Sequence, residues 1–251
     1  MPDSVLLHVG THKTGTSSLQ TFLRDENARS LASAGVCYPP GYLLPALHSD
    51  LPLLALRPDF QWPARLRFPE TQRPSWQAAA AAHVRAQVTT ATAATVVYSH
   101  EDLSYVRSDD ELDRLHALLD GVAVRVVIVL REPEAFLRSY AAQLEATGFP
   151  LSDDPGSFAY VQRGSWLTDY DALVGAYQRH FGSDHVEVLD FDDAVAREGS
   201  IIPAFAHLLG LDRGSLPALD RYALNRAGQH LRLSDDQLAE IRRDLAERHP
   251  A

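Results

Sequence analysis

The sequence predicts an α/β fold in which helices flank a doubly wound parallel sheet, within a single domain over residues 1–251. Short apolar runs alternate with segments of helical periodicity, and these runs are almost wholly apolar rather than apolar at every second position. Strands buried on both faces of a parallel sheet have this composition, and their alternation with helices is typical of doubly wound sheets. A hydrophobic content of 45% in 251 residues is enough for one core, with room for insertions.

The apolar runs give the expected strands, which are Val5–Val9, Thr95–Ser99, Val124–Leu130 and His185–Asp190. They are rich in β-branched residues, which favour strands. We expect all of them to lie in one parallel sheet and to be buried on both faces.

Caps and glycine stops mark the expected helices. The first runs from about 16 to 34 and stops before Gly35, a residue type that commonly ends helices. Another starts at Pro133, where the missing amide costs no hydrogen bond, and the last follows a capping box of Ser234 and Gln237. The other expected helices cover about 78–92, 109–119 and 165–181, and the one that starts at Pro133 extends to about 147.

Two segments, 38–76 and 148–166, lack clear periodicity, and we expect both to be irregular insertions on the acceptor side of the sheet. The first is rich in proline and carries aromatic residues at Tyr38, Tyr42, Phe60, Trp62, Phe68 and Trp76. These aromatic side chains fit either a packed structural loop or a wall that binds an acceptor molecule. The sequence leaves both alternatives open.

Composition excludes several classes of function. A net charge of −10 disfavours nucleic acid and long polyanionic substrates, although it leaves room for a local pocket that binds one small anion. A single cysteine, Cys37, excludes an internal disulfide framework and a cysteine metal cluster. No run approaches the ~18 apolar residues of a membrane span, and no basic residue precedes the first apolar run, so we expect a cytoplasmic protein.

The segment after the first expected strand has the pattern of a phosphate-binding loop. The strand stops at Gly10, and a polar turn leads into a helix, so backbone amides at the helix start can bind an anion. Gly10 and Gly15 have the separation seen in nucleoside triphosphatases, but Thr16 occupies the position where those proteins have lysine. The lysine stands three residues earlier, as Lys13, and it is the only lysine in the chain.

A second anion-binding segment follows the strand 124–130. Arg131 lies directly after this strand, at the edge of the sheet where open α/β folds bind ligands. Ser139 lies eight residues later, about two turns into the next helix. A guanidinium and a hydroxyl suit a dianionic phosphate, whereas an ion pair of Arg131 with Glu132 or another carboxylate is the alternative.

Together, these segments resemble the cofactor signature of the sulfotransferase family. Residues 12–18 (HKTGTSS) look like its 5′-phosphosulfate loop, residues 129–140 like its 3′-phosphate segment, and residues 96–103 (VVYSHEDL) like a strand-end motif of its bacterial members. The similarity in element order covers about 5–210. The resemblance implies a P-loop-like fold that binds 3′-phosphoadenylyl sulfate (PAPS) without a metal ion. It also implies in-line transfer of the sulfuryl group to a hydroxyl or amine, which releases 3′,5′-adenosine bisphosphate (PAP).

The same resemblance implies roles for individual residues. Amides and hydroxyls at the helix start would bind the 5′-phosphate, from Thr14, Gly15, Thr16, Ser17 and Ser18. Lys13 would bind the cofactor and neutralise the charge that develops on the leaving oxygen. Arg131 and Ser139 would select the 3′-phosphate.

The base that deprotonates the acceptor has three candidates. His100 and Glu101 end the second expected strand, beside the same crevice. Ser99-His100 resembles the arrangement of cytosolic sulfotransferases, and Ser99-His100-Glu101 resembles the Ser-x-Glu of bacterial members. His48 is the third candidate, because some carbohydrate sulfotransferases place a catalytic glutamate a few tens of residues after the loop lysine, and this chain has none there.

The sequence leaves other functions open. A nucleotide kinase or triphosphatase needs a lysine at position 16, but this chain has Thr16 there. Such a protein also needs an aspartate that binds Mg²⁺, and Asp190 is available for that role. A non-catalytic PAP-binding protein is a further alternative. The resemblance also implies a basic loop that closes over the cofactor, for which Asn225 or Arg226 is a candidate, and a plain surface loop is the alternative. The acceptor is a small molecule, a lipid or a glycan, we expect no nucleic acid partner, and the sequence does not specify the oligomeric state.

Overall fold

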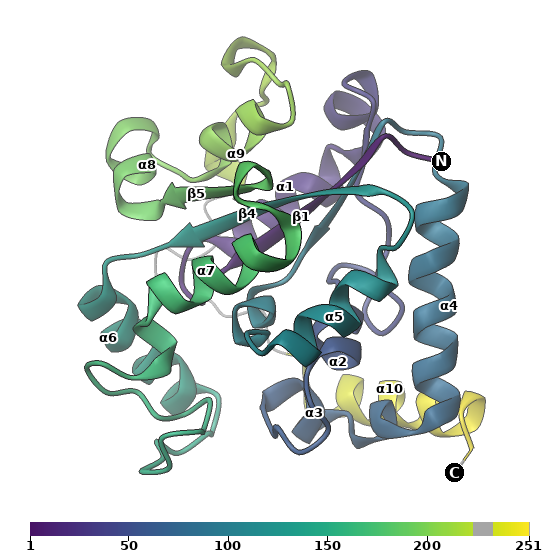
Figure 1. Ribbon diagram of the computed structural model, residues 1–251, viewed down its shortest axis with the longest axis vertical. Helices are drawn as coiled ribbons and strands as arrows, with labels where there is room; N and C mark the ends of the chain where they lie inside the picture. The colour runs from purple at the N-terminus through teal and green to yellow at the C-terminus, as the bar shows by residue number, and fades with distance from the viewer. Residues whose placement is uncertain (223–232, 251) are drawn as a thin grey trace.

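The computed structural model describes residues 1–222 and 233–250, and its centre is a parallel sheet (Figure 1). Within these residues the sheet has five strands in the order β2-β3-β1-β4-β5, and all neighbours run parallel. The strands are β1 (Ser4–Gly10), β2 (Val36–Cys37), β3 (Thr95–Ser99), β4 (Ala123–Leu130) and β5 (Val186–Asp190). The predicted α/β fold with a doubly wound parallel sheet is therefore confirmed.

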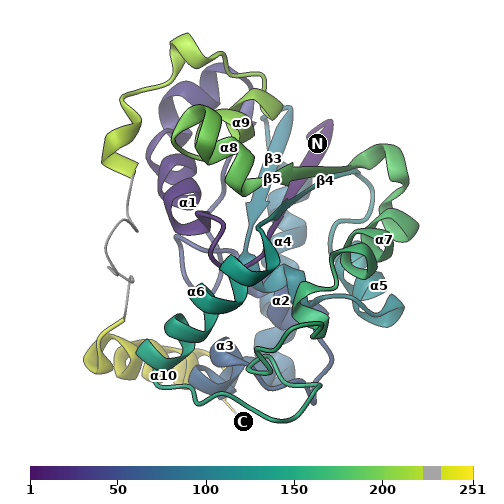
Figure 2. The same ribbon diagram turned by 90° about the vertical axis from the view of Figure 1, so that its left-hand side faces the viewer.

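Helices connect the strands and cover both faces of the sheet (Figures 1 and 2). They are α1 (Thr16–Asp25), α2 (Asp50–Ala55), α3 (Pro63–Arg67), α4 (Pro74–Thr90), α5 (Asp109–Leu118), α6 (Pro133–Ala146), α7 (Tyr170–Phe181), α8 (Phe191–Glu198), α9 (Ile202–Leu208) and α10 (Asp235–Arg248). A short 3₁₀ helix, η3 (Glu101–Tyr105), follows β3 directly. No helix in these two ranges is both long and apolar enough to cross a membrane.

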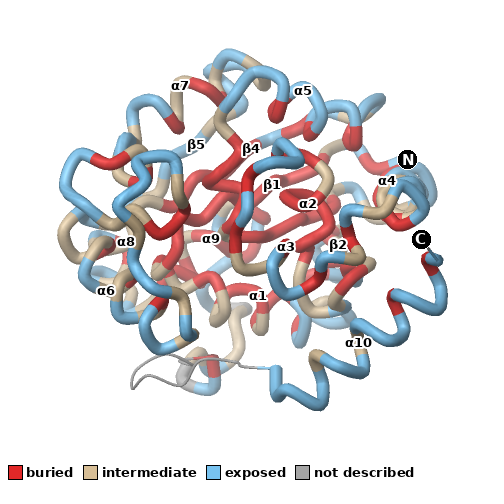
Figure 3. Tube along the Cα trace, turned by 90° about the horizontal axis from the view of Figure 1, so that it is seen from below, coloured by how far each residue is buried: buried red, intermediate tan, exposed pale blue. Residues whose placement is uncertain are grey.

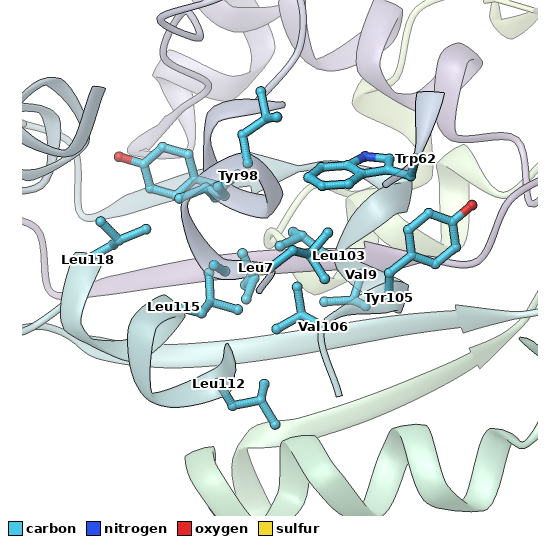
Figure 4. Packing of buried hydrophobic residues seen from close by; sticks show 14 of the residues in the cluster. Leu7, Val9, Trp62, Tyr98, Leu103, Tyr105, Val106, Leu112, Leu115 and Leu118 are labelled. Carbon is cyan, nitrogen blue, oxygen red and sulfur yellow. The ribbon is translucent and has the colours of Figure 1, made fainter. Parts of the chain in front are cut away.

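The side chains of β1 show how the core is divided between the two faces. Val5, Leu7 and Val9 are fully buried on the face that α4, α5 and α7 cover, together with α2, α6 and η3. Leu6 is fully buried on the opposite face, under α1 and α9. Figure 3 shows the buried sheet surrounded by exposed helix surfaces, and Figure 4 shows Leu7 and Val9 within the first of these clusters.

The predicted burial of the last strand is wrong. β5 pairs with β4 along one side and lies at the edge of the sheet, so most of it is partly or fully exposed, and the Val188 side chain is 44% exposed. The opposite edge strand, β2, was not predicted, because its two residues are too few to show any periodicity.

The first predicted helix is interrupted, because α1 ends at Asp25 and a π-helical turn over Asn27–Leu31 follows, after which the helical backbone continues to Ser33. Asn27 lies at the interruption: its side chain accepts a hydrogen bond from the Tyr38 amide (2.7 Å) and donates one to the Tyr38 carbonyl (2.9 Å). The Leu31 amide donates to the Glu26 carbonyl, five residues back. A long-range contact to the strand region therefore overrides the local helical pattern.

The segment 38–76 contains α2 and α3 and packs against the sheet. Trp62 and Trp76 are fully buried, and Tyr38, Phe60 and Phe68 are nearly so. The packed-loop alternative is therefore correct for these side chains, whereas Tyr42 is half-buried. The segment 148–166 has no helix or strand before Trp166 and is irregular as expected.

Candidate active site

The strands β1, β3 and β4 end at one edge of the sheet. The register pairs His8 with Ser99 and Gly10 with Val129, so the loops that follow these three strands start side by side. Thr11 continues the pairing, since its amide and its hydroxyl both donate to the Val129 carbonyl (3.0 and 3.2 Å). This edge is where open α/β sheets bind ligands.

The loop between β1 and α1 has a constrained backbone. Lys13 has a φ of 68°, the only positive φ of a non-glycine residue among those described, and Gly15 has a φ of 76°. The Thr14 hydroxyl donates to the Thr11 carbonyl (2.6 Å) and closes the turn. A Cβ atom at Gly10 would lie 2.9 Å from the Thr16 hydroxyl, so glycine is needed there. Left-handed backbone at a residue with a Cβ is costly and is concentrated at ligand sites.

Helix α1 begins without a cap. Its N-cap residue is Gly15, which has no side chain to accept from the first-turn amides, and its first turn has no acidic residue. In contrast, α5 and α10 begin with complete capping boxes. The first amides of a helix have no intrahelical acceptor, so the start of α1 offers donors and a positive dipole end to an anion. The Thr16 hydroxyl is buried there and has no hydrogen-bond partner among the described residues.

Lys13 lies between a cation and an anion at this edge. Burial lowers the pKa of its ammonium, the nearby Arg131 guanidinium lowers it further, and the Glu101 carboxylate acts in the opposite direction. Three of the predicted site residues are therefore close enough to interact electrostatically. They come from the loops after β1, β3 and β4.

Arg131 contacts the loop between β1 and α1 directly. Its Nη1 donates to the Lys13 carbonyl (3.2 Å), its Nε lies 3.7 Å from Asp192 Oδ1, and its guanidinium lies 5.4 Å from the centre of the Phe191 ring. The alternative partner Glu132 is engaged elsewhere, because its carboxylate caps α6 by accepting from the amides of residues 134 and 135. The sequence analysis missed Asp192, which lies 61 residues after Arg131 in the chain.

Ser139 lies half-buried on α6, two turns from the end of β4. The neighbouring Tyr140 fixes this part of the helix against the loop, because its ring stacks on the imidazole of His12 with centroids 4.7 Å apart. Helix α6 therefore packs against the loop that carries Lys13.

The structure distinguishes the roles of the two strand-end candidates. The amide of Asp102 donates to His100 Nδ1 (3.1 Å), so the proton of a neutral His100 ring is on Nε2. That nitrogen can then donate a hydrogen bond but cannot accept a proton. Glu101, in contrast, has a buried Oε2 without a hydrogen-bond partner in the part of the chain that is described. An unpartnered buried oxygen in a crevice is available to a ligand.

His48 has a different environment. Its Nδ1 accepts from the Ser99 amide (3.0 Å) and its Nε2 donates to the Pro39 carbonyl (2.7 Å). The ring is buried, and burial lowers its pKa to about 4. Both nitrogens are engaged by the backbone, so neither is available to a ligand in this arrangement, and a catalytic role for His48 stays a prediction.

Two residues that the sequence analysis did not select lie at the centre of the site. Asp102 is buried and accepts a hydrogen bond from Trp62 Nε1 (3.0 Å), and His12 Nε2 lies 3.3 Å from its Oδ1. Their positions beside His100 and Lys13 in the sequence were the available signal. Among the described residues, no group of three or more His, Cys, Asp or Glu side chains is arranged to hold a metal ion.

An uncapped helix behind a glycine-bearing loop, on a parallel sheet of this order, defines a P-loop-like α/β protein. No protein-family model matches the sequence, and no curated protein matches it either. Solved structures do match. A sulfotransferase from Alicyclobacillus acidocaldarius superposes with a TM-score of 0.58 at 16% identity, covering 99% of this chain and 94% of that one.

The sulfotransferase domain of the Synechococcus PCC 7002 olefin synthase is also similar, with a TM-score of 0.50, 15% identity and coverage of 98% and 95%. A retinol dehydratase in complex with androsterone and the inactive cofactor PAP gives a TM-score of 0.41 at 15% identity, over 97% of this chain and 64% of that chain. At these identities the first two matches establish the fold. The protein has the α/β fold found in sulfotransferases.

Proposed function

We propose that the protein is a sulfotransferase that moves the sulfuryl group of PAPS to a hydroxyl or amine of a small-molecule, lipid or glycan acceptor. The observation that carries the proposal is the contact between two cations from different loops, Lys13 after β1 and Arg131 after β4, at the start of one uncapped helix. Lys13 lies in front of an uncapped helix, and Arg131 donates to the carbonyl of that same lysine (3.2 Å). Thr16, at the position of a nucleotide-triphosphatase lysine, is buried.

The residues present fit such a cofactor. The first-turn amides of α1 and the unpartnered Thr16 hydroxyl suit a 5′-phosphate, with Ser17 and Ser18 beside them. Thr14 would contribute its amide, because its hydroxyl is used within the turn. For the 3′-phosphate, Arg131 offers an Nε without a hydrogen bond among the described residues, and Ser139 offers a half-buried hydroxyl.

Lys13 would act on the leaving group. PAPS supplies a sulfuryl group, and negative charge gathers on the bridging oxygen as the nucleotide departs. The lysine lies in the loop directly before α1, and a positive charge in a partly buried site stabilises such negative charge strongly. A sulfuryl group carries less charge than a terminal phosphoryl group, so amides and one cation are a sufficient set of groups.

Glu101 would act as the general base. The proton of the acceptor hydroxyl or amine would pass to Glu101 Oε2, which is buried and unpartnered among the described residues. His100 would donate from Nε2 and orient the acceptor, because its Nδ1 already accepts from the Asp102 amide. This assignment follows from the tautomer that the backbone imposes on His100.

A pair of variants tests the base. Glu101→Gln keeps the size of the side chain and removes its basicity, so we expect kcat to fall by ~10²–10⁴-fold with PAP affinity within threefold. His100→Gln retains a donor and should lose ~10-fold or less. Full activity of Glu101→Gln with a larger loss in His100→Gln would assign the base to His100 instead.

Ligand-dependent stability tests the cofactor. A ligand at 100 times its Kd stabilises the folded state by about 2.7 kcal/mol, so we expect PAP to raise Tm and ATP with Mg²⁺ to leave it unchanged. Arg131→Met should remove most of the PAP effect, whereas Lys13→Met should keep it and lose turnover. The control is Arg138→Met, an exposed residue of α6 whose ion pair is with Glu134 (3.8 Å). Stabilisation by ATP with Mg²⁺ alone would reject the proposal.

The alternative function as a nucleotide triphosphatase also requires an aspartate that binds Mg²⁺, and the candidate Asp190 gives it little support. The Asp190 carboxylate accepts from the Asp193 amide (2.8 Å) and caps α8, so it has a structural role at the end of β5. Asn225 and Arg226, the candidates for closing over the nucleotide, lie outside the described residues.

A further inference from the structure

The carboxylate of Asp102 joins three segments that are far apart in the sequence. Trp62 Nε1, next to α3, donates to Oδ2 (3.0 Å), and His12 Nε2, in the phosphate-binding loop, lies 3.3 Å from Oδ1. Oδ2 also lies 3.7 Å from His100 Nδ1, while the amide of the same aspartate donates to that nitrogen (3.1 Å). Asp102 therefore contacts both the loop that carries Lys13 and the histidine beside Glu101.

Aromatic packing holds His12 in place. Its ring stacks on Tyr140 of α6 at 4.7 Å and lies 5.1 Å from the ring of Tyr105, and the hydroxyls of these two tyrosines are 2.5 Å apart. The two tyrosine rings restrict movement of the His12 ring perpendicular to its plane, and the contact with Asp102 restricts its rotation within that plane. The next residue is Lys13, whose left-handed backbone requires support from its neighbours.

The charge of Asp102 suits this positioning. Burial raises the pKa of the carboxyl, but the nearby His100 and His12 rings and the hydrogen bond from Trp62 outweigh burial, so its pKa lies below the ordinary value. A buried carboxylate is stable only when it is paired and hydrogen-bonded. Removal of its charge would therefore loosen the histidine contacts more than the surrounding apolar core.

We propose that Asp102 is a positioning residue that couples the phosphate-binding loop to the segment carrying the base. Through His12 it holds Lys13 in its left-handed conformation, and its backbone amide fixes the tautomer of His100. The predicted effect on turnover rests on the proposed sulfotransferase function. The predicted effect on the Lys13 backbone does not, because it belongs to the protein without any ligand.

The single lysine gives a direct measurement. Protein labelled with ¹⁵N-lysine shows one backbone amide peak, that of Lys13, in a ¹H–¹⁵N spectrum. We expect Asp102→Asn to shift this peak and to lower kcat by 10-fold or more, with PAP affinity within threefold. His12→Phe keeps the stacking on Tyr140 but loses the contact with Asp102, so it should shift the same peak. The double variant should lose no more turnover than the worse single variant, because both changes break one contact.

Tyr177→Phe is the matched control. Its hydroxyl donates to the Leu103 carbonyl (2.8 Å), so the variant loses a buried hydrogen bond to the same 3₁₀ helix without touching the Asp102 carboxylate. We expect it to leave the lysine peak in place and turnover within twofold. An unchanged Lys13 peak in folded Asp102→Asn and folded His12→Phe would overturn the proposal. A shifted peak in a protein that transfers no sulfate would support the coupling and reject the proposed function.

Discussion

Lys13 combines a costly backbone with a charged side chain. Its φ of 68° costs a residue with a Cβ about 1–2 kcal/mol. Glycine accepts this conformation freely but has no ammonium. A lysine at a position where glycine would be less strained fits a functional requirement for the charge.

The strain at Lys13 can be measured by comparing two neutral substitutions. Lys13→Ala and Lys13→Gly both remove the ammonium, but only glycine fits the left-handed backbone without a clash. In urea unfolding we expect Lys13→Gly to be more stable than Lys13→Ala by about 1 kcal/mol. Equal stability would mean that the loop relaxes when the side chain is removed.

The titration of Lys13 should limit activity at high pH. Its pKa is lowered from 10.5, first by burial and then by Arg131, so the cation is lost as pH rises through a value below the ordinary one. We therefore expect kcat/KM for the cofactor, which reports the free enzyme, to fall on the alkaline side before pH 10.5. Lys13→Arg retains its charge at that pH and should extend the plateau, whatever its absolute rate.

At the scale of the elements, the sequence predicted what is encoded locally. The strands β1, β3 and β4, the uncapped start of α1 and the capping box of α10 depend on neighbouring residues, and all of them are present. Local patterns also placed Lys13, Glu101 and Arg131 at strand ends that share one edge.

Contacts across long sequence distances were not predictable in this way. Two contacts join separate loops: the ion pair of Arg131 with Asp192 and the contact of His12 with Asp102. No local sequence pattern indicates that these residues are partners. The end of α1 depends in the same way on the bonds between Asn27 and Tyr38. Such pairings become visible only when the order of the strands is known.

Arg65 shows how the segment 38–76 is stabilised as a packed element. This nearly fully buried guanidinium donates to four backbone carbonyls, those of Leu53, Leu56, Arg57 and Phe60, and lies 4.3 Å from the centre of the Trp62 ring. Burial lowers its pKa to about 10, so it remains charged at neutral pH. A single side chain thereby satisfies the carbonyls that end α2 and begin the next turn.

Removing this side chain should destabilise the fold. Arg65→Met retains apolar volume but leaves the four carbonyls without their donor, so we expect a loss of about 2–4 kcal/mol in the free energy of unfolding. Arg85→Met, at an exposed position of α4, should change it by less than about 0.5 kcal/mol. Chemical denaturation of both variants measures the difference. A loss as small as that of the control would mean that water replaces the guanidinium.

At the scale of the whole molecule, the buried core around the sheet contains two histidines, His8 and His48, as well as apolar side chains. His8 lies on β1, where its Nδ1 is 2.7 Å from the Ser99 hydroxyl, and His48 is bonded to the backbone of the neighbouring strand. Burial lowers the pKa of His8 to about 3 and that of His48 to about 4. Both rings are therefore neutral in the folded protein at pH 7, and protonating them at low pH would destabilise the fold.

The lowered pKa values of these two histidines make the free energy of unfolding depend on pH. Each ring has a pKa of 6.5 when unfolded and a much lower one when folded, so the unfolded chain binds more protons and stability falls as pH drops below about 6.5. Between pH 7 and 5.5 the two histidines should together remove about 2–3 kcal/mol of unfolding free energy. His48→Gln, which can still bond to both backbone groups, should remove close to half of that dependence in urea unfolding at the two pH values. An equally steep dependence in this variant would show that the ring of His48 takes up its proton without unfolding.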